Sequence, residues 1–173
     1  ELFRPLEFFK PLTLFFSILK AKKLFTVSKF VRQELIHEYN VSENKIVLTP
    51  NAAAENFVNY AKDDSKNILK KYKIQQPYIF YVGNAHPHKN LRALEEEFSY
   101  SRLQEEVSSL DIAKYIDFIG FVDDEDLPTL YHNAEALVNP SLYEGFGIQV
   151  LEAFAVGTKV VCSNTTSLPE VGG

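Results

Sequence analysis

The sequence has 173 residues, of which 46% are hydrophobic and 24% charged, as in an ordinary globular protein of one or two domains. It contains no apolar run of about 18 residues or more, so no transmembrane helix is predicted. The net charge is −5, yet residues 1–32 carry seven lysines or arginines against two glutamates, which gives +5 there and −10 elsewhere. Such an acidic body is unsuited to binding a nucleic-acid backbone.

The cysteine content and the two ends of the sequence add further limits. A single cysteine, Cys162, excludes an internal disulfide and fits a reducing, cytosolic compartment. The four histidines show no zinc-ligand spacing with it, so no structural metal is expected. The sequence contains no methionine and ends abruptly at "PEVGG", so we expect a fragment or a chain with residues missing.

The first 50 residues alternate between helical and extended patterns. The first helix, 7–23, is apolar on nearly every side, which fits a buried helix of an incomplete domain or a helix on an anionic membrane surface. Three elements follow: a strand at 23–28, a helix at 29–40 with Ser28 as its N-cap, and a strand at 45–50. We assign residues 1–50 to the C-terminal part of an N-terminal α/β domain.

The remaining residues read as a linker and a second domain. Residues 51–76 are polar and weakly periodic, apart from a helix at 65–72, and are predicted to be the interdomain linker. Residues 77–173 open with an apolar strand, 77–83, typical of a parallel strand covered on both faces. The elements predicted after it are helices at 91–98, 125–134 and 147–157 and strands at 115–122, 135–141 and 158–164. This alternation predicts a doubly wound parallel sheet.

One stretch departs from this alternation. Residues 91–110 place two helical patterns end to end with no strand between them. Two interpretations are open: a single helix of about five turns, or a strand and its loops missing between Tyr100 and Ser101.

Ligands of doubly wound sheets bind at the carboxyl ends of the strands. The loop after strand 77–83 contains Gly83, which turns the chain, and Lys89, which precedes a helix that Asn90 can cap. A lysine in that place would meet a phosphate at the positive end of the helix, or would be an ordinary exposed lysine. The loop has no G-x-G-x-x-G pattern, so a nicotinamide or flavin dinucleotide is not expected.

The stretch "LYEGFGIQVLEAFAVG" places two glutamates at the next strand end. Glu144 suits accepting hydrogen bonds from sugar hydroxyls, although a solvated loop acid is the alternative. Glu152 shares a helical column with Ile148 and Val156, on the side expected to be buried. A carboxylate there needs hydrogen-bond donors, which a ribose, a lysine or a backbone amide would supply.

Five stretches in order resemble the signature of the retaining glycosyltransferases of family 4: "FTVSKF", "YVGNAHPHKNL", "FIGFVDDEDLPTLYHNAEALVNPS", "PSLYEGFGIQVLEA" and "SNTTSLPEV". The resemblance implies the GT-B fold, with two Rossmann-like domains and the active site between them; the N-terminal one would be incomplete. It implies transfer of a hexose from a GDP- or UDP-sugar to a hydroxyl of a glycan or lipid-linked acceptor, with anomeric retention and no metal. "PHKN" is reminiscent of mannosyltransferases.

The resemblance also implies a role for each matching residue. Lys89 would neutralise the diphosphate leaving group, Glu144 would hold hydroxyls of the transferred sugar, and Glu152 would bind the ribose. Lys89 and Glu144 are thus the candidate catalytic residues. The other candidate nucleotide-sugar-binding residues are Gly83, Asn84, Gly120, Phe121, Val122, Gly145, Phe146, Gly147 and Ile148. Of these, 120–122 would form a wall beside the base, and the N–H groups of 145–147 would assist Glu144.

The chain also departs from the family pattern. Asn84 stands where many relatives carry an arginine, so the phosphate charge would rest more heavily on Lys89. A non-catalytic nucleotide-sugar-binding relative, or a GT-B epimerase or phosphorylase, is the alternative function. We expect a cytoplasmic protein, at the inner face of the membrane if its basic N-terminal helix contacts lipid.

Overall fold

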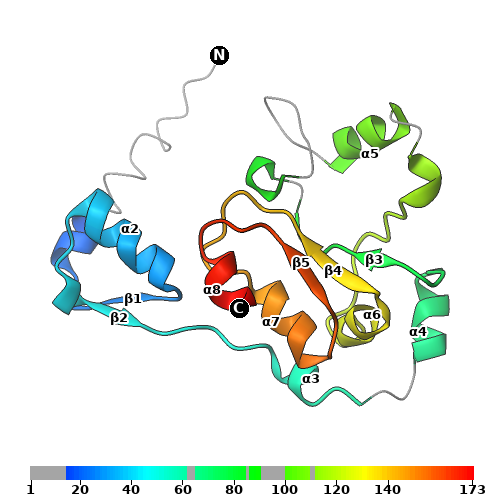
Figure 1. Cartoon of the computed structure of the whole chain (residues 1–173), viewed down its shortest axis with the longest axis horizontal. Helices are drawn as coiled ribbons and strands as arrows, with labels where there is room; N and C mark the ends of the chain where they lie inside the picture. The colour runs from blue at the N-terminus through cyan, green and yellow to red at the C-terminus, as the bar shows by residue number, and fades with distance from the viewer. Residues whose placement is uncertain (1–14, 62–64, 85, 91–99, 110–111) are drawn as a thin grey trace. The chain divides into compact units, whose positions relative to one another are not determined.

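The structure is a computed structural model in which the chain divides into two compact units, Glu1–Asn51 and Ala52–Gly173. It describes residues 15–61, 65–84, 86–90, 100–109 and 112–173. The two units are described separately below (Figure 1). None of the helices in these ranges has the length and apolarity needed to cross a membrane.

The first unit contains a parallel pair of strands joined by a helix. Strand β1 (Leu24–Thr26) pairs with β2 (Ile46–Leu48), and α2 (Lys29–Tyr39) connects them, followed by the 3-10 turn η1 (Glu43–Lys45). Ser28 caps α2 as predicted, since its side chain accepts a hydrogen bond from the N–H of Val31 over 3.1 Å.

The core of this unit is small. It consists of Ile18, Val41 and Ile46, with three half-buried side chains packed around them. Ile18 belongs to the helical residues 15–20, where its neighbours Phe16 and Leu19 are exposed. In the described part of the predicted first helix, Ile18 is therefore the one buried residue. Residues 7–14 of that helix lie outside the described ranges.

The second unit is built on a three-stranded parallel sheet in the order β3-β4-β5. The strands are β3 (Ile79–Phe80), β4 (Ala136–Asn139) and β5 (Val160–Cys162). Helices α6 (Leu127–Asn133), α7 (Ile148–Ala155) and α8 (Leu168–Gly172) alternate with them, as the sequence predicts for a Rossmann-like sheet. Figure 1 shows α7 lying along β4 and β5, and the two helices α6 and α7 also contact each other.

Residues 51–76, predicted to be a linker, contain two helices that pack into this second unit. They are α3 (Glu55–Val58) and α4 (Ser65–Lys71), and the latter matches the helix predicted at 65–72. Phe57 is 2% exposed and lies with Leu69 in the same core as Leu130 and Leu137. This stretch therefore buries apolar side chains where an extended linker would expose them. The assignment of residues 1–50 and 77–173 to two Rossmann-like domains stays a prediction.

The strand predicted at 115–122 is wrong. After the helix α5 (Tyr100–Ser109) and the turn η3 (Ala113–Tyr115), residues 116–122 run without a strand partner. Ile119 and Val122 pack against the core, but Phe121 is 85% exposed. A strand requires a neighbour to accept its hydrogen bonds, and between β3 and β4 the described residues form no other strand. The helix predicted at 91–98 lies outside the described residues.

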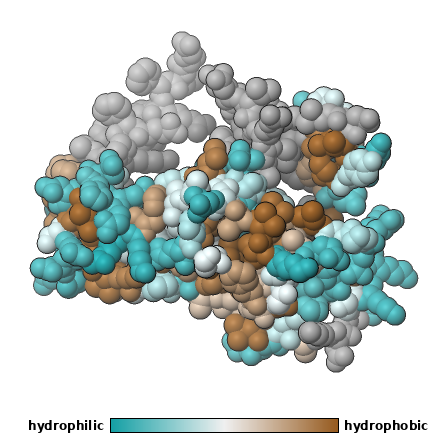
Figure 2. Space-filling model, in the orientation of Figure 1, coloured by the Kyte–Doolittle hydropathy of each residue, from teal (hydrophilic) through white to brown (hydrophobic). Residues whose placement is uncertain are grey.

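Apolar residues are also exposed at single positions elsewhere. Figure 2 shows them scattered among hydrophilic side chains on the face in view. Outside the helical residues 15–20, single exposed apolar residues are normal for a folded chain.

Candidate functional site

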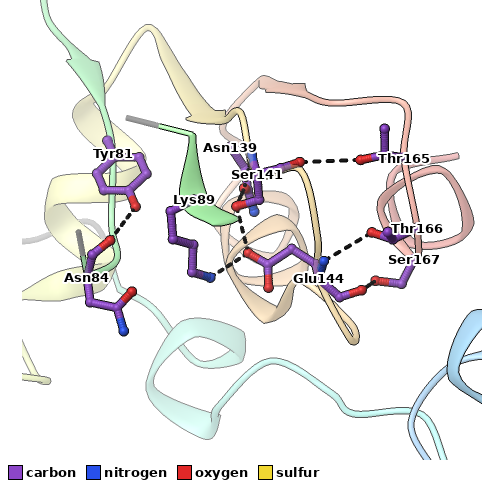
Figure 3. Close-up of polar contacts among 9 residues, drawn as sticks. All are labelled: Tyr81, Asn84, Lys89, Asn139, Ser141, Glu144, Thr165, Thr166 and Ser167. Carbon is purple, nitrogen blue, oxygen red and sulfur yellow. Dashed lines mark hydrogen bonds and ion pairs between the residues drawn. The ribbon is translucent and has the colours of Figure 1, made fainter. Parts of the chain in front are cut away.

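Two loops that follow neighbouring strands meet at one edge of the β3-β4-β5 sheet (Figure 3). Because β3 and β4 are parallel neighbours, their carboxyl ends lie at the same edge. The loop after β3 leads to the 3-10 turn η2 (Pro87–Lys89), and the loop after β4 leads to Glu144. The backbone N–H of Leu142 donates to the carbonyl of His88 over 2.7 Å and so ties the loops together.

Lys89 and Glu144, the candidate catalytic residues, form an ion pair at this meeting point. Lys89 Nζ lies 2.5 Å from Glu144 Oε1, and the two side chains are only 13% and 12% exposed. Burial reduces solvent screening of the charges, so the pair is stronger than one on an open surface. Lys89 is thus neither an exposed loop lysine nor far from the predicted sugar-binding acid.

Ser141, which the sequence analysis did not single out, holds the Glu144 side chain. It is fully buried, and its Oγ lies 2.8 Å from Glu144 Oε1 and 2.7 Å from Oδ1 of Asn139, the last residue of β4. The serine thereby connects the end of the strand to the carboxylate. Its place just before Glu144 in "PSLYEG" is the sequence feature that could have indicated this role. A sequence does not show, however, whether a loop serine is buried.

A third loop fixes the backbone of Glu144 on both sides. The Glu144 N–H donates to Thr166 Oγ1 over 3.1 Å, and Ser167 Oγ donates to the Glu144 carbonyl over 2.8 Å. Thr165 Oγ1 also donates to the carbonyl of Ser141 over 3.3 Å. The hydroxyl-rich loop after β5 therefore serves as a support for Glu144 (Figure 3).

The segment after Glu144 turns the chain into α7. Gly147 has φ 89° and ψ 55°, and a Cβ there would lie 2.7 Å from Leu168 Cδ2, so only glycine fits without strain. Phe146 is buried, Gly145 is half-buried, and α7 begins at Ile148. The close approach to α8 therefore explains why residue 147 is a glycine, whether or not a ligand binds there.

Glu152 lies in α7 and finds its hydrogen-bond donor in a tyrosine. The hydroxyl of Tyr131, in α6, donates to Glu152 Oε2 over 2.8 Å. Burial raises the pKa of Glu152, the Tyr131 hydrogen bond partly opposes this, and the negative charge of Asp124 adds to it. The protein partner is thus neither of the two considered from the sequence, a lysine or a backbone amide.

Gly83 and Asn84 lie at the end of β3, against Tyr81. The Tyr81 hydroxyl donates to the carbonyl of Asn84 over 2.9 Å (Figure 3), and a Cβ on Gly83 would lie 2.7 Å from that hydroxyl. Burial, with a contribution from the charge of Glu144, raises the pKa of Tyr81 to about 12. The field of Glu144 therefore reaches the loop that carries Gly83.

Residues 120–122, the predicted wall beside the base, lie in the segment before α6. Phe121 lines an open hollow whose other residues are Lys71, Asp123, Asp124, Glu125 and Asp126. Asp124 is the residue whose charge acts on Glu152. Of the predicted residues, the structure thus brings Lys89 and Glu144 into direct contact, whereas the partner of Glu152 is a residue that was not predicted. In the ranges that the structure describes, no three His, Cys, Asp or Glu side chains are grouped as metal ligands.

A parallel sheet whose strands alternate with helices, with a buried lysine–glutamate pair at its carboxyl edge, is a partial Rossmann-like fold. Residues 96–172 match the family model for glycosyl transferases group 1. Two solved structures show the same fold: a glycosyltransferase from Rickettsia africae (TM-score 0.72, 22% identity, 90% of this chain and 48% of that one) and Anabaena Alr3699/HepE in complex with UDP and glucose (TM-score 0.75, 15% identity, 95% and 51%).

Curated relatives are similar over most of this chain. O-antigen chain mannosyltransferase B of Escherichia coli is 36% identical over 179 residues, which cover 91% of this chain and 47% of the relative. O-antigen chain mannosyltransferase RfbU of Salmonella typhimurium is 31% identical over 173 residues, covering 90% and 46%. The chain thus spans about half the length of these relatives.

Proposed function

We propose that this chain is the nucleotide-sugar-binding part of a retaining glycosyltransferase, which transfers mannose from a GDP-sugar to a glycan or lipid-linked acceptor in surface-polysaccharide biosynthesis. The observation that carries the proposal is the buried ion pair between Lys89 and Glu144 at the carboxyl edge of the sheet. The names of the curated relatives, which are O-antigen mannosyltransferases, support the choice of mannose.

The geometry of the pair suits a phosphate and a sugar side by side. The ammonium of Lys89 has three N–H donors, and one suffices for Glu144, so the others are available to diphosphate oxygens. Both described donors to Glu144, Lys89 and Ser141, use Oε1. Its other oxygen, Oε2, is then the acceptor for a sugar hydroxyl. The lysine would stabilise the charge that develops on the leaving diphosphate.

Glu152 completes the proposal by binding the ribose. Its half-buried carboxylate lies in α7, the helix that starts directly after the Glu144 loop. The proposed sugar-binding acid thus lies in the loop that leads into this helix, and the proposed ribose-binding acid lies in the helix itself. We propose that neither nucleotide binding nor sugar transfer requires a metal ion, because Lys89 supplies the positive charge at the diphosphate.

Binding experiments on the chain test this proposal directly. Calorimetry and thermal shift are expected to show binding of GDP-mannose and GDP, since ligands of the folded state raise the melting temperature. Glu152→Ala should weaken GDP, whereas Glu144→Ala should weaken GDP-mannose more than GDP. Ser108→Ala, which removes an exposed hydroxyl bonded within α5, is the matched control. Folded protein that binds no nucleotide or nucleotide sugar would overturn the proposal.

A transfer assay separates catalysis from binding. Radiolabelled mannose should move from GDP-mannose to a lipid-linked acceptor with the full-length protein, and Glu144→Ala should abolish most of this turnover. Nucleotide binding without any transfer would favour the non-catalytic alternative.

We also propose contact between the N-terminal helix and an anionic membrane. Phe15, Phe16 and Leu19 are 42%, 50% and 57% exposed, directly before a lysine-rich turn. Exposed apolar side chains beside cations are typical of interfacial helices. Flotation with vesicles that contain anionic lipid should recover the chain, whereas vesicles of neutral lipid should not. Equal recovery with both vesicles, or with neither, would contradict membrane contact.

A further inference from the structure

We propose that Tyr131 is a positioning residue for nucleotide binding: its buried hydroxyl holds Oε2 of Glu152 and leaves Oε1 to receive the ribose. This inference rests on the proposed function, because it presupposes that Glu152 binds the ribose. It concerns a residue on a different helix, α6, whose side chain is 0% exposed and therefore cannot touch the ligand itself.

The tyrosine ring is held rigidly by aromatic neighbours from two other elements. It packs edge-to-face on Phe57 of α3, with ring centroids 5.1 Å apart, and on Phe80 of β3 at 5.3 Å. Such contacts add to the energy of burial and specify one ring orientation. The backbone is fixed as well, since the carbonyl of Tyr131 accepts a hydrogen bond from buried Thr158 Oγ1 over 2.7 Å.

The hydroxyl is a permanent donor to Glu152. Burial and the negative charge of Glu152 raise the pKa of Tyr131 far above its ordinary value, so the phenol keeps its proton at every physiological pH. An ionised carboxylate can only accept, and the 2.8 Å bond ends on Oε2. Tyr131 therefore fixes which carboxylate oxygen faces the protein.

The remaining oxygen is the one available to a ligand. The bond from Tyr131 ends on Oε2, so Oε1 is the oxygen that we assign to the ribose. The groups that act electrostatically on this carboxylate are Tyr131 on α6 and Asp124 in the segment before α6. They act in opposite directions: the tyrosine favours the ionised form, whereas Asp124 and burial oppose it. Without the tyrosine, Glu152 would lose both its orientation and part of its tendency to ionise.

The decisive variant is Tyr131→Phe, which keeps the ring contacts and removes only the hydroxyl. We expect about tenfold weaker GDP binding, the size of one charge-assisted hydrogen bond. The pH below which GDP affinity is lost should also move upward, because the pKa of Glu152 rises when its donor is removed. The matched control is Tyr78→Phe, whose hydroxyl donates to the carbonyl of Leu130 over 2.6 Å and does not contact Glu152.

Each outcome has a separate meaning. If the wild-type chain fails to bind GDP, the proposed function fails. If it binds GDP and Tyr131→Phe binds equally well with the same pH profile, only the positioning role is overturned. Equal weakening by Tyr131→Phe and Tyr78→Phe, without a pH shift, also overturns it, since that marks general loosening. In a Glu152→Gln background, Tyr131→Phe should cause no pH shift.

A second measurement applies if Tyr131→Phe does not fold. In wild-type chain with ¹³C-labelled tyrosine, the Tyr131 ring signal should move as Glu152 titrates and again when GDP is added. A signal that responds to neither overturns the proposal.

Discussion

Lys89 Nζ lies 2.5 Å from Glu144 Oε1, and Ser141 Oγ approaches the same oxygen to 2.8 Å. The lysine comes from the loop after β3 and the glutamate from the loop after β4, so this contact joins two loops through residues 55 positions apart in sequence. The ammonium of Lys89 has further N–H donors, which a diphosphate could use while the contact with Glu144 is kept. The pair therefore couples the sugar-binding and phosphate-binding halves of the proposed site.

The first prediction concerns the stability of this pair. Lys89→Met should lower the free energy of unfolding by about 1–3 kcal/mol, because it leaves the Glu144 carboxylate buried with less compensation. Adding Glu144→Gln should recover part of the loss, since no charge then remains. Urea unfolding measures both. Lys70→Met, at an exposed position of α4, is the control and should change stability by no more than about 0.5 kcal/mol. If the double variant loses as much free energy of unfolding as the two single variants lose together, the two residues are not coupled.

The second prediction concerns the pH dependence that Glu152 gives to stability. Its pKa is raised in the folded chain, so its favourable contribution is present below the ordinary carboxyl pKa and is lost as the pH rises through the folded value. Glu152→Gln does not titrate and can still accept from Tyr131. The melting temperature of the variant minus that of wild type should therefore be larger at about pH 7.5 than at about pH 4.

The size of that gain is small. About 1 kcal/mol corresponds to roughly 2–4 °C for a chain of this length. The same variant should bind GDP more weakly, because an amide cannot replace the ionised acceptor. Thermal melts at both pH values check the stability, with Glu135→Gln, a charge outside the site, as the control. A difference in melting temperature that does not change with pH would contradict the raised pKa.

The third prediction compares two glycines at the ends of α7. Gly147 and Gly157 both have positive φ, 89° and 80°, so alanine at either costs about 1–2 kcal/mol of backbone strain. Only at Gly147 would the new Cβ overlap another atom, Leu168 Cδ2, whose side chain is fully buried. Gly147→Ala should therefore destabilise the chain by about 1–3 kcal/mol more than Gly157→Ala. Equal losses in denaturant unfolding would exclude the close contact between α7 and α8.

The fourth prediction tests whether α3 belongs to the core of the second unit. Phe57→Ala should cost about 3–5 kcal/mol, because it empties a site that is 2% exposed. Val58→Ala, one residue further on the same helix, is the control, because Val58 is 65% exposed and should tolerate the change. Urea unfolding distinguishes them. Similar, small effects of the two variants would mean that residues 51–76 behave as the linker predicted from the sequence.

The sequence by itself predicted β3, β4, β5 and the helices between them, and it showed a resemblance to a family of glycosyltransferases. Repeated apolar runs separated by polar loops predict parallel strands, and the stretches that carry Lys89, Glu144 and Glu152 are local patterns that a sequence displays directly. It did not determine that Phe57 and Leu69 lie in the core, because a polar segment with few apolar side chains looks alike in a linker and in a covering layer. Nor did it show that residues 115–122 lack a strand partner, since hydrogen bonding between strands depends on distant neighbours.

Only the tertiary structure decided which side chain each glutamate contacts. The carboxylate of Glu144 accepts hydrogen bonds from Lys89 and Ser141, and that of Glu152 accepts one from Tyr131. The partners Lys89 and Tyr131 lie 55 and 21 residues away in sequence. Periodicity reports which face of a helix is buried, but a donor across the interface is set by how the helices and loops pack. A tyrosine is apolar in its ring and polar only at its tip, so the sequence does not show which group the Tyr131 hydroxyl contacts.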